Sequence, residues 1–142
     1  MRCMMVTNAD ALIAHASNLV TRALPGVFAI YVFGSHASGQ QTPKSDLDLA
    51  MLGGEPVAPA RLYDIARGLE VELGTDIDLI DLLAASTVLK KEVIANGRLI
   101  LCVDRVATLD FEARSLSEYG RYREGIEPLL KAVRETGQAY AP

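Results

Sequence analysis

The sequence has little cysteine, little histidine and no basic stripe. These shortages argue against a zinc site, a disulfide and direct nucleic-acid binding. Two cysteines and two histidines are scattered at positions 3, 15, 36 and 102, without the spacing of a zinc site. So few cysteines argue against a disulfide and are typical of a reducing compartment, so we expect a cytoplasmic protein. The net charge is −4 and Lys90-Lys91 is the one basic doublet, which argues against direct nucleic-acid binding.

Long apolar runs are also missing. No stretch approaches the ~20 apolar residues that span a bilayer, and no apolar run follows a basic region at the N-terminus. We therefore expect no membrane association. What remains is an ordinary globular composition, with 50% hydrophobic and 23% charged residues in a chain of 142, enough for one domain with a hydrophobic core.

Hydrophobic periodicity predicts helices that alternate with strands. Helices are expected at residues 10–24, 60–73, 86–96 and from 104 onward, and strands at 27–33, 46–52, 76–82 and 98–103. This order predicts an α/β (α+β) domain with a small mixed sheet flanked by helices. We expect residues 1–104 to form that domain and residues 105–142 to form a C-terminal helical tail packed on it, kinked at Pro128.

The apolar stripe of the helical tail has two interpretations. A stripe at helical spacing usually packs on its own domain. The alternative is that Tyr119, Tyr122 and Ile126 form part of a partner-binding face. The two interpretations are compatible, because a bent helix can pack one side and expose another.

The most informative pattern begins where an apolar strand meets a glycine. Gly34 and Ser35 follow the apolar residues 27–33, and after ten further residues come Asp46 and Asp48. Alternate residues of a strand share a face, so the two carboxylates should stand side by side, roughly 7 Å apart along the strand. Two like charges on a strand that looks buried are costly unless a cation lies between them. Mg²⁺, which prefers carboxylate oxygens, is the expected cation.

A third carboxylate, Asp78, lies in the next predicted strand. If it lies beside Asp46 and Asp48, the three form the ligand set of a two-metal phosphoryl- or nucleotidyl-transfer site. The Gly34-Ser35 turn supplies the complementary part, since glycine lets backbone N–H groups approach a phosphate and the serine hydroxyl adds a donor. Each piece alone is usually a turn or a solvated strand edge, but their order and spacing together predict this site.

These motifs resemble the signature of the DNA polymerase β-like nucleotidyltransferase superfamily, which is Gly-Ser followed ten residues later by Asp-x-Asp. The third acidic residue of that superfamily sits in a hydrophobic–Asp–hydrophobic strand, which matches Ile77-Asp78-Leu79. This strand and residues 85–89 resemble the corresponding segment of the MNT-type (minimal nucleotidyltransferase) antitoxins. Those antitoxins are paired with HEPN-domain toxins in type VII toxin–antitoxin systems. The resemblance covers about residues 8–104 and implies the minimal polymerase β-like fold.

The resemblance also implies an activity and a partner. It implies a protein adenylyltransferase, an antitoxin that transfers AMP from ATP to a tyrosine of its cognate HEPN-type RNase toxin with Mg²⁺, and so neutralises it. By position, Asp46 and Asp48 would be catalytic metal ligands, and Asp78 would be a third ligand or the base that takes the tyrosine proton. Gly34 and Ser35 would bind the nucleotide phosphates.

One departure from the family pattern concerns the phosphate contacts. Many relatives have Ala-Arg-Gly where this chain has Ala37-Ser38-Gly39, so a possible arginine contact is missing. Lys44 is a candidate to replace it, although a solvated loop lysine is the competing interpretation. His36 lies beside the turn and is either a substrate contact or a structural residue.

Two other functions are compatible with the same motifs. An antitoxin could keep the fold and neutralise its toxin by stoichiometric binding alone. A small-molecule nucleotidyltransferase of the aminoglycoside type would use the same chemistry, but such enzymes usually carry an added domain for the drug, and 142 residues leave little room for one.

Overall fold

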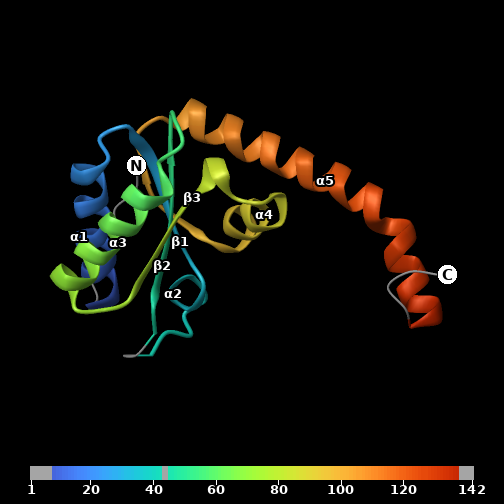
Figure 1. The fold of residues 1–142 in the computed structure, drawn as a ribbon, viewed down its shortest axis with the longest axis horizontal. Helices are drawn as coiled ribbons and strands as arrows, with labels where there is room; N and C mark the ends of the chain where they lie inside the picture. Colours follow the sequence, from blue (N-terminus) through green and yellow to red (C-terminus); the bar gives the residue numbers. More distant parts are fainter. Residues whose placement is uncertain (1–7, 43–44, 138–142) are drawn as a thin grey trace.

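The computed structural model describes residues 8–42 and 45–137 of the chain (Figure 1). Helices alternate with strands as the periodicity predicts. The helices are α1 (Asn8–Ala23), α2 (Ser35–Ser38), α3 (Pro59–Leu73), η1 (Leu82–Ala84, a 3₁₀ turn), α4 (Thr87–Asn96) and α5 (Arg105–Thr136). The strands are β1 (Val27–Phe33), β2 (Leu47–Gly53), β3 (Ile77–Asp81) and β4 (Arg98–Cys102).

The four strands form one mixed sheet in the order β3-β2-β1-β4. Strand β1 pairs antiparallel with both β2 and β4, whereas β2 and β3 run parallel. Helix α3 makes the crossover that two parallel strands require. Because of these directions, the end of β1 meets the beginnings of β2 and β3 at one edge of the sheet. The predicted α/β (α+β) fold class is confirmed.

Helices cover both faces of the sheet, and each face has its own core. On one face, α1 and α3 bury residues such as Ile13 and Leu69 against Ile30 and Leu49 of the strands. On the other face, η1, α4 and the start of α5 cover alternate strand residues, among them Tyr31. The period-2 alternation of β1 and β2 therefore divides their side chains between two apolar layers.

Most predicted element boundaries are correct within one or two residues. Ser86 caps α4, since its hydroxyl accepts a hydrogen bond from the Leu89 N–H at 3.1 Å. Two of the small differences concern aspartates. Strand β2 begins at Leu47, so Asp46 precedes the strand, and β3 ends at Asp81. The Asp81 carboxylate accepts from the Leu83 N–H at 3.0 Å, which starts the 3₁₀ turn instead of a longer strand.

The helical tail is the 32-residue helix α5. Only the first part of α5 packs on the domain, where the Tyr31 hydroxyl donates to Glu112 at 2.6 Å and Ser115 is buried. The rest of the helix projects away from the sheet as an arm (Figure 1). The reason is chain length, because a 32-residue helix spans about 48 Å and outruns a domain of this size. Pro128 lies inside this helix without ending it, and the arm bends in its C-terminal part.

Three further expectations concern the cysteines, Lys44 and membrane-spanning helices. Cys102 is a free thiol whose Sγ lies 3.5 Å from the Thr108 hydroxyl, while Cys3 lies outside the described residues. Lys44 also lies outside them. Within the part of the chain that the structure describes, no helix combines the length and apolar character needed to cross a bilayer.

Candidate functional site

Gly34 directly follows β1 and lies against Asp48 in the candidate site. Its backbone has φ 70° and ψ −146°, a conformation that residues with a side chain rarely adopt. A Cβ atom built on Gly34 would overlap the Oδ2 atom of Asp48. The glycine is therefore required twice, once by the backbone conformation and once by the close approach of the carboxylate. Ser35 begins α2 directly after it.

The strand register brings two of the predicted carboxylates together. Asp48 of β2 pairs directly with Asp78 of β3 in the parallel ladder, and with Phe33 of β1 on its other side. Asp46 lies just before β2 and is exposed, while Asp48 is half-buried. Because Leu47 and Leu49 point into the core beneath α1 and α3, the carboxylate of Asp48 points to the opposite face, the one that α4 and α5 cover.

The surroundings of Asp48 disfavour the charged form of its carboxyl group. Burial raises the pKa of the Asp48 carboxyl above its ordinary value, and the negative charges of Asp78 and Asp46 raise it further. His36 acts in the opposite direction and lowers that pKa. The carboxylate is thus destabilised by its own surroundings, which is the electrostatic condition that a bound cation relieves.

The donor chemistry of this edge fits a hard divalent cation. Carboxylate oxygens from Asp46, Asp48 and Asp78 are the ligands that Mg²⁺ prefers. Across residues 8–42 and 45–137, however, no three acidic, histidine or cysteine side chains are already gathered closely enough to hold a metal ion. The three-carboxylate ligand set stays a prediction.

His36 is an unusual residue at this site. It is the first residue after Ser35 in α2, only 9% of its surface is exposed, and neither ring nitrogen has a hydrogen-bond partner. Buried polar atoms without a partner are rare in folded proteins, and each costs about 1–3 kcal/mol. The sequence showed His36 beside the turn, but only the structure shows that its imidazole is buried and unpaired.

Replacing His36 with leucine should raise the free energy of unfolding by about 1 kcal/mol, because the change removes two buried nitrogens that lack partners. We expect the affinity for ATP to fall about tenfold at the same time, since a bound nucleotide would be the missing hydrogen-bond partner. Thermal unfolding and calorimetric titration with ATP measure the two effects. His15→Leu on the exposed side of α1 is the matched control. Lower stability with unchanged ATP affinity would instead give the His36 imidazole a packing role.

A fourth carboxylate, Asp81, is buried but serves the fold. Its two oxygens accept hydrogen bonds from the Val57 N–H at 2.9 Å and from the Leu83 N–H at 3.0 Å. It therefore ties the loop after β2 to the end of β3. The sequence pattern indicates that Asp81 is not part of the candidate site. Asp81 lies three positions after Asp78 on the same strand, so the two side chains face opposite sides of the sheet.

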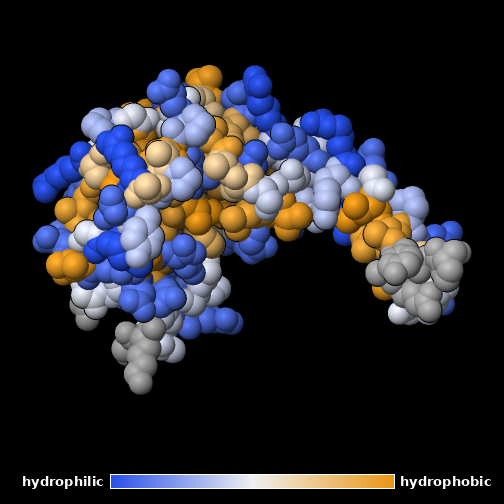
Figure 2. Space-filling view, viewed as in Figure 1, coloured by the Kyte–Doolittle hydropathy of each residue, from blue (hydrophilic) through white to orange (hydrophobic). Residues whose placement is uncertain are grey.

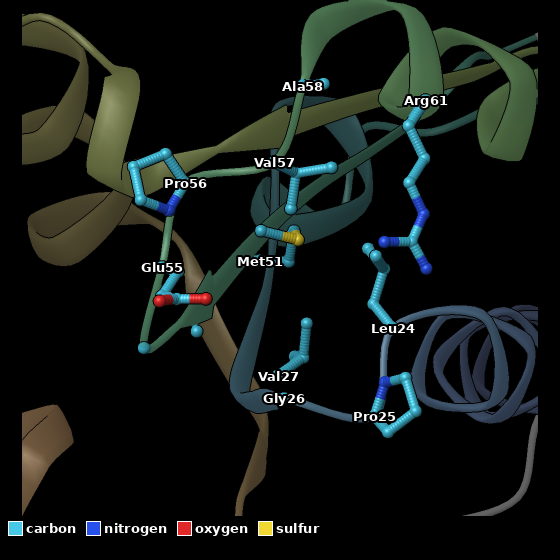
Figure 3. Close-up of a pocket in the computed structure, with 12 residues that line it drawn as sticks. Leu24, Pro25, Gly26, Val27, Met51, Glu55, Pro56, Val57, Ala58 and Arg61 are labelled. Atoms are coloured by element: carbon cyan, nitrogen blue, oxygen red, sulfur yellow. The ribbon is translucent and has the colours of Figure 1, made fainter.

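A pocket of about 380 Å³ lies at the opposite end of the sheet (Figure 3). It is lined by Val27 at the start of β1 and Gly53 at the end of β2, whereas the candidate site adjoins the end of β1 and the start of β2. The guanidinium of Arg61 points toward Leu24 there, and it already donates to the Ala23 carbonyl at 3.0 Å. The pocket is thus separate from the carboxylates.

Comparison with known proteins agrees with this geometry. The family described as "Polymerase beta, Nucleotidyltransferase" matches residues 18–106, which include the glycine turn and all three carboxylates. The chain belongs to this polymerase β nucleotidyltransferase family, and the fold and the resemblance inferred from the motifs are confirmed.

One curated relative with a named activity matches part of the chain. The protein adenylyltransferase MntA of Shewanella oneidensis is 37% identical over 75 residues, which are 53% of this chain and 54% of that protein. The match thus spans about half the length of the curated relative.

Two solved structures share the fold over nearly the whole chain. A chain of a toxin–antitoxin structure with AMP-PNP superposes with a TM-score of 0.78 at 28% identity, covering 90% of this chain and 99% of that one. A chain from the complex of a tri-AMPylated Shewanella oneidensis HEPN toxin with its MNT antitoxin gives 0.76 at 25% identity, with 89% and 98% covered.

Proposed function

We propose that this protein is an antitoxin that adenylylates a tyrosine of a cognate HEPN-type toxin, with ATP as the AMP donor. The observation that carries the proposal is the placement of Asp48 opposite Asp78, directly over Gly34, at the edge where β1 ends. The adenylyltransferase and toxin–antitoxin relatives support the choice of a protein acceptor.

In the proposed reaction the tyrosine oxygen attacks the α-phosphorus of ATP. A new P–O bond forms, the bond from the α-phosphorus to the oxygen that bridges to the β-phosphate breaks, and pyrophosphate leaves. The tyrosine proton would pass to a carboxylate base, for which Asp78 is the candidate. Mg²⁺ held by Asp46, Asp48 and Asp78 would neutralise phosphate charge and lower the pKa of the attacking hydroxyl. The backbone N–H groups after Gly34 and the Ser35 hydroxyl would bind the phosphates of the leaving group.

The proposed reaction is tested with labelled ATP, Mg²⁺ and the purified product of the neighbouring gene. We expect the label on a tyrosine of that product and loss of its RNase activity. Because an enzyme turns over, one molecule of this protein should modify at least about ten molecules of acceptor.

Stoichiometry separates the proposal from a purely binding antitoxin. If neutralisation needs one molecule of this protein for each acceptor, and no label is transferred, the enzymatic account is wrong. An aminoglycoside incubated in place of the protein acceptor serves as the control for a small-molecule transferase.

A further inference from the structure

Helix α5 carries one continuous seam of side chains, spaced alternately by four and three residues. The seam residues are Thr108, Glu112, Ser115, Tyr119, Tyr122, Ile126, Leu129 and Val133. This is the a/d spacing by which one helix packs against another. All eight therefore lie along one side of the helix.

The first half of the seam is already covered by the domain. Thr108 and Ser115 are 1% and 2% exposed, and Glu112 accepts the hydrogen bond from the Tyr31 hydroxyl. Tyr119 also contacts the domain, where the Lys91 Nζ lies 5.2 Å from its ring centre. The seam is thus an intramolecular interface up to this point.

The second half of the seam continues beyond the domain and becomes more apolar. Tyr122, Leu129 and Val133 are 42%, 45% and 36% exposed, and Ile126 lies between them. The opposite side of the same segment carries the exposed charges Glu124, Lys131 and Glu135. From Tyr119 to Val133 this apolar stripe is about 21 Å long, which suits a partner helix of about four turns.

The borders of the exposed half allow a close approach. One border carries Arg123 and Arg134, which both pair with Glu127, at 3.3 and 2.7 Å, so this border keeps a net charge of only +1. The other border carries Gly125 and Ala132, two small residues seven positions apart. A Cβ built on Gly125 would meet no atom within 4 Å, so this border is open.

The arm and the candidate site share one side of the molecule. The carboxylate of Asp48 faces the sheet side that α4 and α5 cover, and the arm bends toward the edge at which α2 lies (Figure 1). Apolar side chains gather along the concave underside of the arm (Figure 2). A protein seated against this concave side would lie beside the edge that holds Gly34 and Asp48.

We propose that the exposed half of the seam, Tyr122 to Val133, docks an α-helix of the protein acceptor and holds that acceptor beside the candidate site. This inference rests on the proposed function. Its own basis is that an interface already formed by Thr108, Ser115 and Tyr119 continues without a break beyond the domain.

A second copy of this chain fits the exposed seam less well. A stable protein interface buries roughly 1,200–2,000 Å² in total, and two stripes of four side chains each fall short of that area. An acceptor seated in the concavity also contacts the domain, which adds the missing area. The acceptor is therefore the occupant to which the geometry points.

The test uses the full chain with Ile126→Glu and Leu129→Glu together, since glutamate keeps helix propensity while it removes apolar contact. The dissociation constant for the neighbouring gene's product should rise at least about 100-fold, since each lost apolar side chain is worth roughly tenfold. AMP transfer at low acceptor concentration should fall in parallel. ATP affinity, measured without the acceptor, should stay unchanged. Glu124→Gln with Lys131→Gln on the opposite side is the matched control.

Three outcomes overturn the inference. One is an unchanged dissociation constant in the seam variant. Another is an equal loss in the control pair. The third is a wild-type homodimer in sedimentation that the seam variant abolishes, because a second copy would then cover the seam. Failure of the proposed function would give a different result. The wild-type chain would bind the product of the neighbouring gene without transferring any label to it.

Discussion

Replacing Asp48 with asparagine is expected to lower the rate of AMP transfer by a factor on the order of 1,000 or more. The change removes the carboxylate that pairs with Asp78, while the side chain keeps its size and shape. A metal-bound site supplies several kcal/mol of transition-state stabilisation, and about 4 kcal/mol corresponds to this factor. Initial rates with labelled ATP and the toxin measure the effect. Asp64→Asn on the exposed side of α3 removes the same charge away from the site and should transfer AMP normally.

The same variant should be more stable than the wild type when Mg²⁺ is absent. Because the pKa of Asp48 is raised in the folded protein, its contribution to stability is fully present at pH values below its ordinary pKa and is lost as the pH rises through the raised value. At neutral pH the wild-type carboxylate is therefore unfavourable, and asparagine removes that penalty.

Thermal unfolding of both proteins between pH 4 and pH 8 measures this difference. The two melting temperatures should converge as the pH falls, because Asp48 becomes protonated, and saturating Mg²⁺ should raise that of the wild type selectively. A variant that still transfers AMP at the wild-type rate would remove Asp48 from the proposed mechanism. Equal stability of the two proteins at neutral pH would contradict the electrostatic description of the site.

The second large effect is expected at Gly34. Alanine there would have to adopt φ 70° and ψ −146°, which costs about 1–3 kcal/mol, and its Cβ would overlap the Asp48 carboxylate. We expect a melting temperature several degrees lower and, because the carboxylate must move, a loss of AMP transfer of about 100-fold or more.

Gly39 offers a matched control for this variant. It also has a positive φ, 78°, but a Cβ built there would meet no atom within 4 Å. Gly39→Ala should therefore lose some stability through backbone strain and keep most of the activity. If the two alanine variants lose activity equally, strain in the turn accounts for the effect, and the contact between Gly34 and Asp48 does not matter.

Much of the fold was predictable from local patterns. The strand at residues 27–33 and the helix cap at Ser86 depend on periodicity and on one hydroxyl, which are properties of short segments. The direction of the tail was not predictable in this way. The spacing of its apolar residues is the same whether the domain covers them or leaves them exposed, and only the size of the domain decides how many are covered.

The candidate site was also predictable only in part. The sequence by itself determined which residues are candidates for the chemistry, since Gly34, Asp46, Asp48 and Asp78 were all predicted from residue type, order and spacing. Only the tertiary structure decided that Asp48 pairs with Asp78, that its oxygen lies against Gly34, and that the His36 nitrogens are buried without partners. The physical reason is that residue type and strand period are local properties, whereas register and burial depend on segments that meet only when the chain folds.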